Sequence, residues 1–251
     1  MTIDGYCHCG ISKYRPVDVV LGVMNKHAVD RAVLCQHLGE YDNSYLAEVV
    51  NDHPGRFAAV CLVDPTQPDA HVQLRRWEEH GNFRGVRILA EWLEPYFPLW
   101  RAAVERGLRL VLYAPDGVAG SVQAIRRLLQ DCPEGNIVIS HLGNPKLLEG
   151  ELRAGSQILG LEQTPGVFVL LSGLSMFCAY PYSELRHLVV EVIRRFGANR
   201  LMWGSNFPVC GDENAYGRDL AQLLCGEWGL SSQQIECIAR DTARTVWFDS
   251  E

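Results

Sequence analysis

Three polar residues stand two apart near the start of the chain: Asp4, Tyr6 and His8. Residues two apart on a strand face the same side, so alternation predicts that these three share one face and that Cys7 and Cys9 take the other. A carboxylate, a phenol and an imidazole on one face could act in proton transfer near neutral pH. The simpler alternative is a buried strand whose histidine and tyrosine only satisfy hydrogen bonds.

More polar residues stand at or just after the ends of later apolar segments. They are Asp64, Arg87, Tyr113, His141, Ser172 and Asn206. Any one of them has a structural explanation. Two imidazoles, a guanidinium and a phenol at one end of a sheet instead indicate an active site.

The elements that must position these residues alternate along the chain as strand and helix. After the first strand, apolar segments predict strands at 31–36, 57–63, 84–89, 108–113, 137–141, 167–172 and 200–204. Helical spacing predicts helices at 16–27, 43–51, 68–80, 95–106, 118–130, 145–161, 181–196, 214–227 and 231–246, with a break near Gly155 in the 145–161 segment.

Eight short apolar strands separated by helices predict parallel pairing and a single α/β domain, a closed (β/α)8 barrel over residues 1–251. The alternative is an open doubly wound sheet, but no GxGxxG turn follows the first strand. In the barrel, the loops at the carboxyl ends of the strands build the active site.

Composition excludes several classes of function. The 251 residues carry a formal charge of −7 and no basic run, which argues against nucleic acid as a partner. No apolar run is long enough to span a membrane, and the nine cysteines form no CxxC pair, so reduced thiols and a cytoplasmic location are expected. Strand alternation predicts that Cys7, Cys9, Cys35 and Cys61 point outward as core residues rather than acting as nucleophiles.

Several motifs resemble the amidohydrolase superfamily, in particular the amidohydrolase-related branch with 2-pyrone-4,6-dicarboxylate lactonase and the aminocarboxymuconate semialdehyde decarboxylase relatives. The first strand is similar to an Asp-x-His-x-His motif, from Asp4 to His8. His141-Leu142-Gly143 is similar to the His-x-Gly strand end, and 204–208 to a Gly-Ser-Asp-x-Pro stretch. The segment 43–65 and Gly85-Val86-Arg87 are also typical of the branch, which implies the barrel fold over nearly the whole chain.

Two positions depart from the pattern of the branch. Tyr6 replaces the first histidine and Asn206 replaces the aspartate, so only His8 and His141 remain of the metal ligands that the resemblance implies. A catalytic zinc normally has three protein ligands. No cofactor is therefore expected; the alternative is a divalent metal such as zinc on His8 and His141, with Asp4 or a cysteine thiolate as a third ligand.

The resemblance predicts a hydrolase that acts on a small carboxylated or cyclic substrate, by metal-independent acid–base hydrolysis of a lactone or amide. We expect His8, His141, Tyr6 and Asn206 to be catalytic, and Arg87, Tyr113, Ser172 and Asp64 to bind the substrate, which Arg87 predicts to be anionic. Lyase, cyclase or decarboxylase chemistry, and an inactive ligand-binding barrel, stay open as alternatives. Members of the family often self-associate, so a homo-oligomer is a further expectation.

Overall fold

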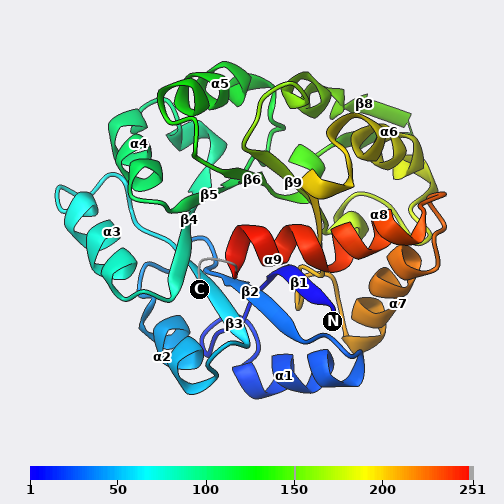
Figure 1. The fold of residues 1–251 in the computed structure, drawn as a ribbon, viewed down its shortest axis with the longest axis horizontal. Helices are drawn as coiled ribbons and strands as arrows, with labels where there is room; N and C mark the ends of the chain where they lie inside the picture. The colour runs from blue at the N-terminus through cyan, green and yellow to red at the C-terminus, as the bar shows by residue number, and fades with distance from the viewer. Residues whose placement is uncertain (150, 249–251) are drawn as a thin grey trace.

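Eight parallel strands form one sheet in the order β1-β2-β3-β4-β5-β6-β9-β10, which curls into a barrel with helices outside it (Figure 1). The computed structural model describes residues 1–149 and 151–248. The barrel strands are β1 (Ile3–Cys7), β2 (Arg31–Cys35), β3 (Phe57–Cys61), β4 (Phe83–Leu89), β5 (Arg109–Tyr113), β6 (Ile137–Ile139), β9 (Val167–Ser172) and β10 (Leu201–Gly204). The predicted (β/α)8 barrel is confirmed.

The first and last strands meet at their carboxyl ends. The backbone N–H of Asn206 donates to the carbonyl of Tyr6 at 2.9 Å, and that of His8 donates to the carbonyl of Phe207 at 2.8 Å. These bonds bring the carboxyl ends of β1 and β10, the first and last strands of the sheet, side by side. The residues that follow the two strands therefore share one rim.

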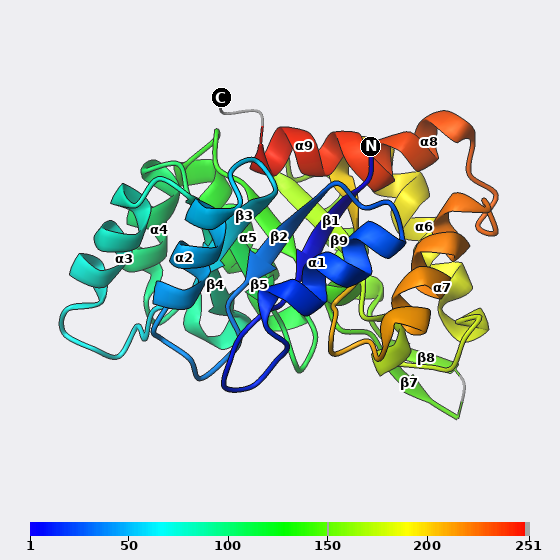
Figure 2. The same ribbon diagram turned by 90° about the horizontal axis from the view of Figure 1, so that it is seen from below.

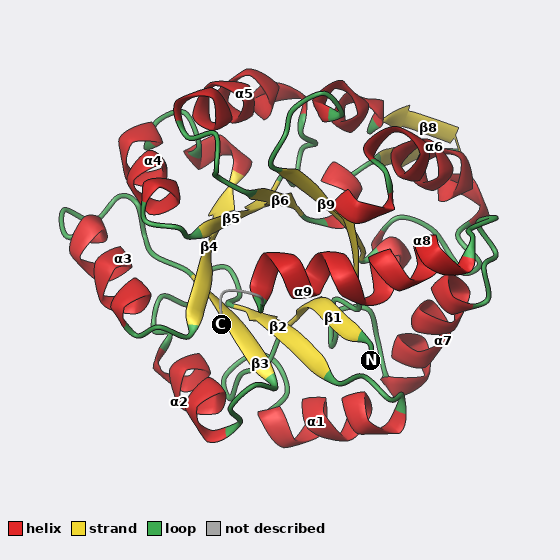
Figure 3. Ribbon diagram, in the orientation of Figure 1, coloured by secondary structure: helices red, strands yellow, loops and turns green. Residues whose placement is uncertain are grey.

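Helices surround the barrel, and most of them bury apolar residues against the strands (Figure 3). The helices are α1 (Val17–Lys26), α2 (Ser44–Asp52), α3 (Ala70–Glu79), α4 (Phe97–Glu105), α5 (Val122–Asp131), α6 (Arg186–Phe196), α7 (Glu213–Leu224), α8 (Ser232–Glu236) and α9 (Thr242–Trp247). A π-helical turn, Cys237–Asp241, joins the last two. The carboxylate of Asp212 accepts hydrogen bonds from Asn214 N and Ala215 N and so caps α7.

The barrel interior is a separate apolar layer. Alternate residues of the strands, among them Ile3, Val33, Val111 and Leu170, fill it, while their neighbours face the helices. Helix α9 lies across the end opposite the carboxyl ends of the strands and seals it with Trp247 (Figure 2). The predicted site residues lie at the other end of the barrel, where the strands end.

The predicted helix at 145–161 is wrong. The antiparallel strands β7 (Lys146–Leu148) and β8 (Glu151–Ala154) form a hairpin there, followed by a 3-10 helix, Ser156–Leu161. The break that the sequence placed near Gly155 coincides with a φ of +137° at that residue, a value suited to glycine. Residue 150, inside the same segment, lies outside the described residues.

No helix within residues 1–149 and 151–248 has the length and apolar character needed to cross a membrane.

Candidate active site

Tyr6 lies at the centre of a buried cluster of rings at the carboxyl ends of the strands. Its ring meets the His8 ring edge to face at a centroid distance of 5.0 Å, and the His141 ring at 5.1 Å. The guanidinium carbon of Arg87 lies 5.9 Å from the centroid of Tyr6 and 5.5 Å from that of Tyr113. Predicted site residues from β1, β4, β5 and the end of β6 thus come together in one cluster.

One polar atom in this cluster, Nε of Arg87, has no hydrogen-bond partner among the described residues. The hydroxyl of Tyr6 has no nitrogen or oxygen partner there and interacts with the thiol of Cys35, a weak hydrogen-bonding group. Arg87 is 6% exposed and donates from Nη1 to the carbonyl of Gln36 at 2.8 Å, and no carboxylate of the described residues forms an ion pair with it. A buried guanidinium without a counter-ion is costly, and so is a buried hydroxyl whose neighbour is only a weak hydrogen-bonding group. Both groups are therefore available to an anionic or oxygen-bearing ligand.

His8 is held in one tautomer. Its Nδ1 lies 2.6 Å from the carbonyl oxygen of Cys35, which can only accept, so Nδ1 carries the proton. Burial lowers the pKa of His8 well below the usual value, and the charge of Arg87 lowers it further. The ring is therefore neutral at neutral pH, with Nε2 as the proton acceptor, and the side chain of Asn206 hydrogen-bonds the same ring.

His141 follows β6 and is anchored by Ser172 at the end of β9. Its Nδ1 lies 2.9 Å from the serine Oγ, and its backbone N–H donates to the same oxygen at 3.3 Å. The hydroxyl can donate to Nδ1 or accept from it, so it accommodates either tautomer. Burial, with Arg87 next, lowers the pKa of His141 to about 3, and the ring of Tyr113 lies edge-on at 5.8 Å.

Gly173 explains how His141 and Asn206 come together. A Cβ at Gly173 would stand 2.8 Å from His141 Nδ1, 2.8 Å from the Met176 sulfur and 3.1 Å from Asn206 Nδ2, and its φ is +63°. Asn206 is buried, and its Nδ2 donates to that sulfur at 3.3 Å. His141 and Asn206 have φ values of +53° and +55°, a conformation that costs energy in non-glycine residues and is concentrated at functional sites.

Asp4 does not share a face with Tyr6 and His8, contrary to the alternation argument. The pairing of β1 with β2 shifts register between Asp4 and Cys7, so the side chain of Asp4 turns outward. Its Oδ2 accepts from the hydroxyl of Ser205 at 2.6 Å and its Oδ1 from the Ser205 N–H at 2.8 Å. Burial raises the pKa of Asp4 to about 6. Its role is to join β1 to the end of β10.

Asp64 uses its carboxylate in its own turn, where it accepts from Thr66 and Gln67 and remains partly exposed. A role in substrate binding stays a prediction for this residue.

Cys7, Cys9 and Cys61 face the helices as predicted, but Cys35 faces the barrel interior beside Tyr6 and Arg87. Strand alternation could have predicted this orientation, because Cys35 is two residues after Val33, which also points inward.

Sequence reasoning also missed Tyr14, in the loop between β1 and α1. Its ring stacks on the ring of His8 at 4.8 Å with an interplanar angle of 19°, and meets His37 edge-on at 5.2 Å. No spacing rule predicts a contact made by an irregular loop. Tyr14 covers the cluster from the rim.

The amidohydrolase family model matches residues 8–248. The chain belongs to the amidohydrolase family. It is 28% identical over 218 residues to the L-fucono-1,5-lactonase of Burkholderia ambifaria, covering 79% of this chain and 73% of the lactonase. It is 27% identical over 193 residues to the uncharacterized protein y4mH of Sinorhizobium fredii, covering 67% of this chain but only 62% of that protein's length.

Solved structures with this fold include a protein from Pseudomonas putida named as a 2-pyrone-4,6-dicarboxylic acid hydrolase. This amidohydrolase-family chain superposes on it with a TM-score of 0.77 at 24% identity, covering 98% and 96% of the two chains. The dihydroxybenzoic acid decarboxylase of Polaromonas sp. JS666, solved with bound manganese, gives a TM-score of 0.72 at 14% identity, covering 98% and 96%. At these identities the likeness shows the shared fold.

The donor set of this member of the family does not suit the divalent metal that some of these proteins bind. Within residues 1–149 and 151–248, no three histidine, cysteine or acidic side chains are grouped as metal ligands. A phenol, Tyr6, and an amide, Asn206, stand beside His8 and His141, and Asp4 turns away. The positive charge of Arg87 in the same cluster opposes a second cation.

Proposed function

We propose that this amidohydrolase-family enzyme hydrolyses a small lactone that carries a carboxylate, without a metal. The observation that carries the proposal is the buried guanidinium of Arg87, whose Nε has no partner among the described residues, next to the hydroxyl of Tyr6, which has only the weakly bonding thiol of Cys35 beside it. A carboxylate can accept hydrogen bonds from Arg87 and offset its charge. The hydroxyl of Tyr6 can donate to a carbonyl oxygen as negative charge develops there.

His8 is the general base in this mechanism. Its Nε2 takes a proton from water while the water oxygen attacks the lactone carbonyl, and Tyr6 donates to the resulting oxyanion. When the tetrahedral intermediate collapses, the bond to the ring oxygen breaks and His8 returns the proton to that oxygen. The sum is one water added and one ester bond broken, which gives a hydroxy acid.

His141 and Asn206 position the reactants. His141 can accept or donate at Nε2, because Ser172 accommodates either tautomer. Asn206 can hold a water molecule through its amide, but it cannot deprotonate that water, which leaves this task to His8. The relative with a lactonase name, at 28% identity, supports a cyclic ester over an amide as the substrate.

The test compares 2-pyrone-4,6-dicarboxylate with L-fucono-1,5-lactone, a carboxylated and an uncharged lactone. We expect hydrolysis of the carboxylated lactone class to be favoured, and Arg87→Gln to remove that preference by raising KM for the carboxylated substrate. Equal kcat/KM for the two lactones in the wild type, or an unchanged preference in Arg87→Gln, contradicts the role of Arg87. Absence of lactone hydrolysis in the purified enzyme contradicts the reaction itself.

Decarboxylation is the second candidate, and the amide of Asn206 favours it. With no carboxylate in the described cluster to activate water, the same donors could hold a carboxylated ring while its C–C bond to the carboxylate breaks. Carbon dioxide then leaves, and the ring carbon takes a proton from solvent. Release of carbon dioxide from 2,6-dihydroxybenzoate, with no lactone hydrolysis, would establish this reaction in place of the first.

A further inference from the structure

Asp4 is a buried carboxylate outside the cluster of rings, and it holds the residue that precedes Asn206. Its Oδ2 accepts from the hydroxyl of Ser205 at 2.6 Å, and its Oδ1 accepts from the Ser205 N–H at 2.8 Å. Both residues are almost fully buried. One carboxylate therefore fixes the main chain and the side chain of Ser205 together.

The hydrogen bonds continue from Ser205 to His8. The Ser205 Oγ, which donates its proton to Asp4, accepts from the N–H of Phe207 at 2.9 Å. The carbonyl of Phe207 in turn accepts from the N–H of His8 at 2.8 Å. The bonds thus leave β1 at Asp4, pass through the turn 205–207, and return to the chain just after β1 at His8.

Asn206, in the middle of the turn 205–207, needs support from its surroundings. Its φ of +55° costs energy in a non-glycine residue and persists only where neighbouring structure holds it. Its N–H donates to the carbonyl of Tyr6 at 2.9 Å, and its carbonyl accepts from the N–H of Cys210 at 3.1 Å. The direction of the Asn206 amide therefore depends on how the turn is held.

Two glycines allow the carboxylate to reach the turn. A Cβ at Gly5 would stand 2.8 Å from a main-chain oxygen of β10, and a Cβ at Gly204 would stand 2.8 Å from the Cβ of Tyr6. Only glycine lets the two backbones approach this closely. Gly5 follows Asp4 and Gly204 precedes Ser205, so the close approach occurs where the two side chains bond.

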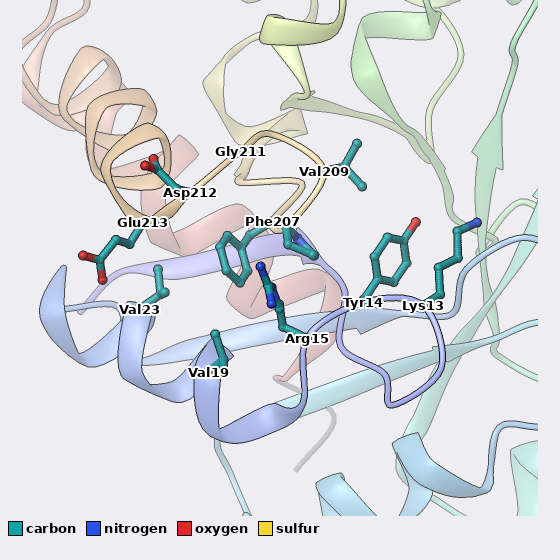
Figure 4. Close-up of a pocket in the computed structure, with 11 residues that line it drawn as sticks. Lys13, Tyr14, Arg15, Val19, Val23, Phe207, Val209, Gly211, Asp212 and Glu213 are labelled. Atoms are coloured by element: carbon teal, nitrogen blue, oxygen red, sulfur yellow. The ribbon is translucent and has the colours of Figure 1, made fainter.

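On its outer side the turn borders open space. Phe207 and Val209 line a groove of about 640 Å³, together with Val19 and Val23 of α1 (Figure 4). Val209 is 46% exposed, so packing on this side is incomplete. The hydrogen bonds from the β1 side, where Asp4 lies, are then the main support of the turn.

We propose that Asp4 is a positioning residue for the proposed reaction. Through Ser205 it fixes the turn, and the turn sets the main chain of His8 and the direction of the Asn206 amide. The inference rests on the proposed function, in which His8 is the base and Asn206 holds the water. Arg87 bonds to the carbonyl of Gln36 and takes no part in these bonds, so turnover and substrate binding should respond separately.

The experiment compares the wild type with Asp4→Asn, Ser205→Ala and the double variant. The control is Asp219→Asn on α7, because Asp219 also accepts from a hydroxyl, that of Tyr182 at 2.5 Å, but outside the cluster. One readout is kcat and KM for 2-pyrone-4,6-dicarboxylate. The other needs no substrate: it is the NMR resonance of the His8 Nδ1 proton in protein with isotope-labelled histidine, assigned by its loss in His8→Asn.

We expect kcat to fall by up to about 100-fold in Asp4→Asn and in Ser205→Ala, the cost of a misplacement of about 1 Å, with KM changed by less than about twofold. Because the two residues act through the same bonds, the double variant should lose no more than the weaker of the single variants. The His8 resonance should shift or broaden in these variants and stay unchanged in Asp219→Asn.

A purely structural role for Asp4 gives a different result. A lower Tm with kcat within about twofold of the wild type in both single variants overturns the positioning role, as does a loss that appears in KM alone. An unchanged His8 resonance in both variants also overturns it. The two proposals fail separately. If the wild type hydrolyses no lactone, the proposed function fails and the resonance still tests Asp4; if it hydrolyses the lactone and neither readout moves, the positioning role alone fails.

Discussion

The Nδ1 of His8 lies 2.6 Å from the carbonyl oxygen of Cys35, and this single contact fixes which nitrogen of the ring can act as a base. The carbonyl belongs to the neighbouring strand β2, so the tautomer is set by the closed barrel itself. Every step of the proposed reaction depends on Nε2 as the proton acceptor, on the ring that the side chain of Asn206 also hydrogen-bonds.

Replacement of His8 should remove the base without removing the fold. In His8→Asn the amide can still donate to the Cys35 carbonyl, but it cannot take a proton from water. We expect kcat to fall by about 10²–10⁴, the usual contribution of general acid–base catalysis. Steady-state kinetics, with circular dichroism as a control for folding, measures this; a kcat within a factor of two of the wild type would assign the base elsewhere.

Removal of the Tyr6 hydroxyl should lower activity and leave stability unchanged or higher. In Tyr6→Phe the oxyanion loses a donor, which typically costs about 10²–10³ in kcat. The folded protein loses a buried hydroxyl that has no nitrogen or oxygen partner among the described residues and interacts with the thiol of Cys35, a weak hydrogen-bonding group. Kinetics and thermal unfolding are measured on the same preparation. The matched control is Tyr96→Phe, a tyrosine that precedes α4 outside the cluster, and a lower Tm for Tyr6→Phe than for this control would show that the Tyr6 hydroxyl is structurally bonded.

The pH dependence of kcat/KM should reflect two imidazoles, His8 and His141, that are neutral in the folded protein. Because burial and Arg87 lower the pKa of His8, and that of His141 to about 3, both rings stay unprotonated as the pH falls through the ordinary histidine range. The acid limb of kcat/KM should therefore lie below about pH 6.5. In Arg87→Met this limb should move to higher pH, since a charge that lowers the pKa of His8 is gone. An acid limb at the ordinary value in both proteins would contradict this.

Asp4 should make the folded protein less stable as the pH rises. Its pKa is about 6 in the folded state against 3.8 in the unfolded chain, so the folded protein binds the extra proton and the carboxyl's contribution is lost as the pH rises from about 4 to 6. Two pKa units correspond to about 3 kcal/mol. The free energy of unfolding of the wild type minus that of Asp4→Asn should fall by an amount of that order over this window in denaturant titrations. A constant difference would mean that Asp4 is ionised throughout.

Purified protein should carry no stoichiometric divalent metal. We expect this from the donors, since Tyr6 and Asn206 stand beside His8 and His141, and Arg87 opposes a second positive charge. Elemental analysis of protein prepared without chelator measures it, with His8→Ala and His141→Ala alongside. A stoichiometric metal in the wild type that is lost in both variants would return metal-assisted hydrolysis as the mechanism.

The sequence by itself determined the barrel, because apolar strands and amphipathic helices alternate along the chain and the period of each pattern is local. It also placed His8, Arg87, His141 and Asn206 at strand ends, where parallel strands of a barrel must bring them to one rim. Only the tertiary structure decided which of these side chains meet. The register shift in β1 turns Asp4 outward, because one irregular residue reverses the alternation that the prediction used. The stacking of Tyr14 on His8 depends on the path of a loop, which no periodic pattern specifies.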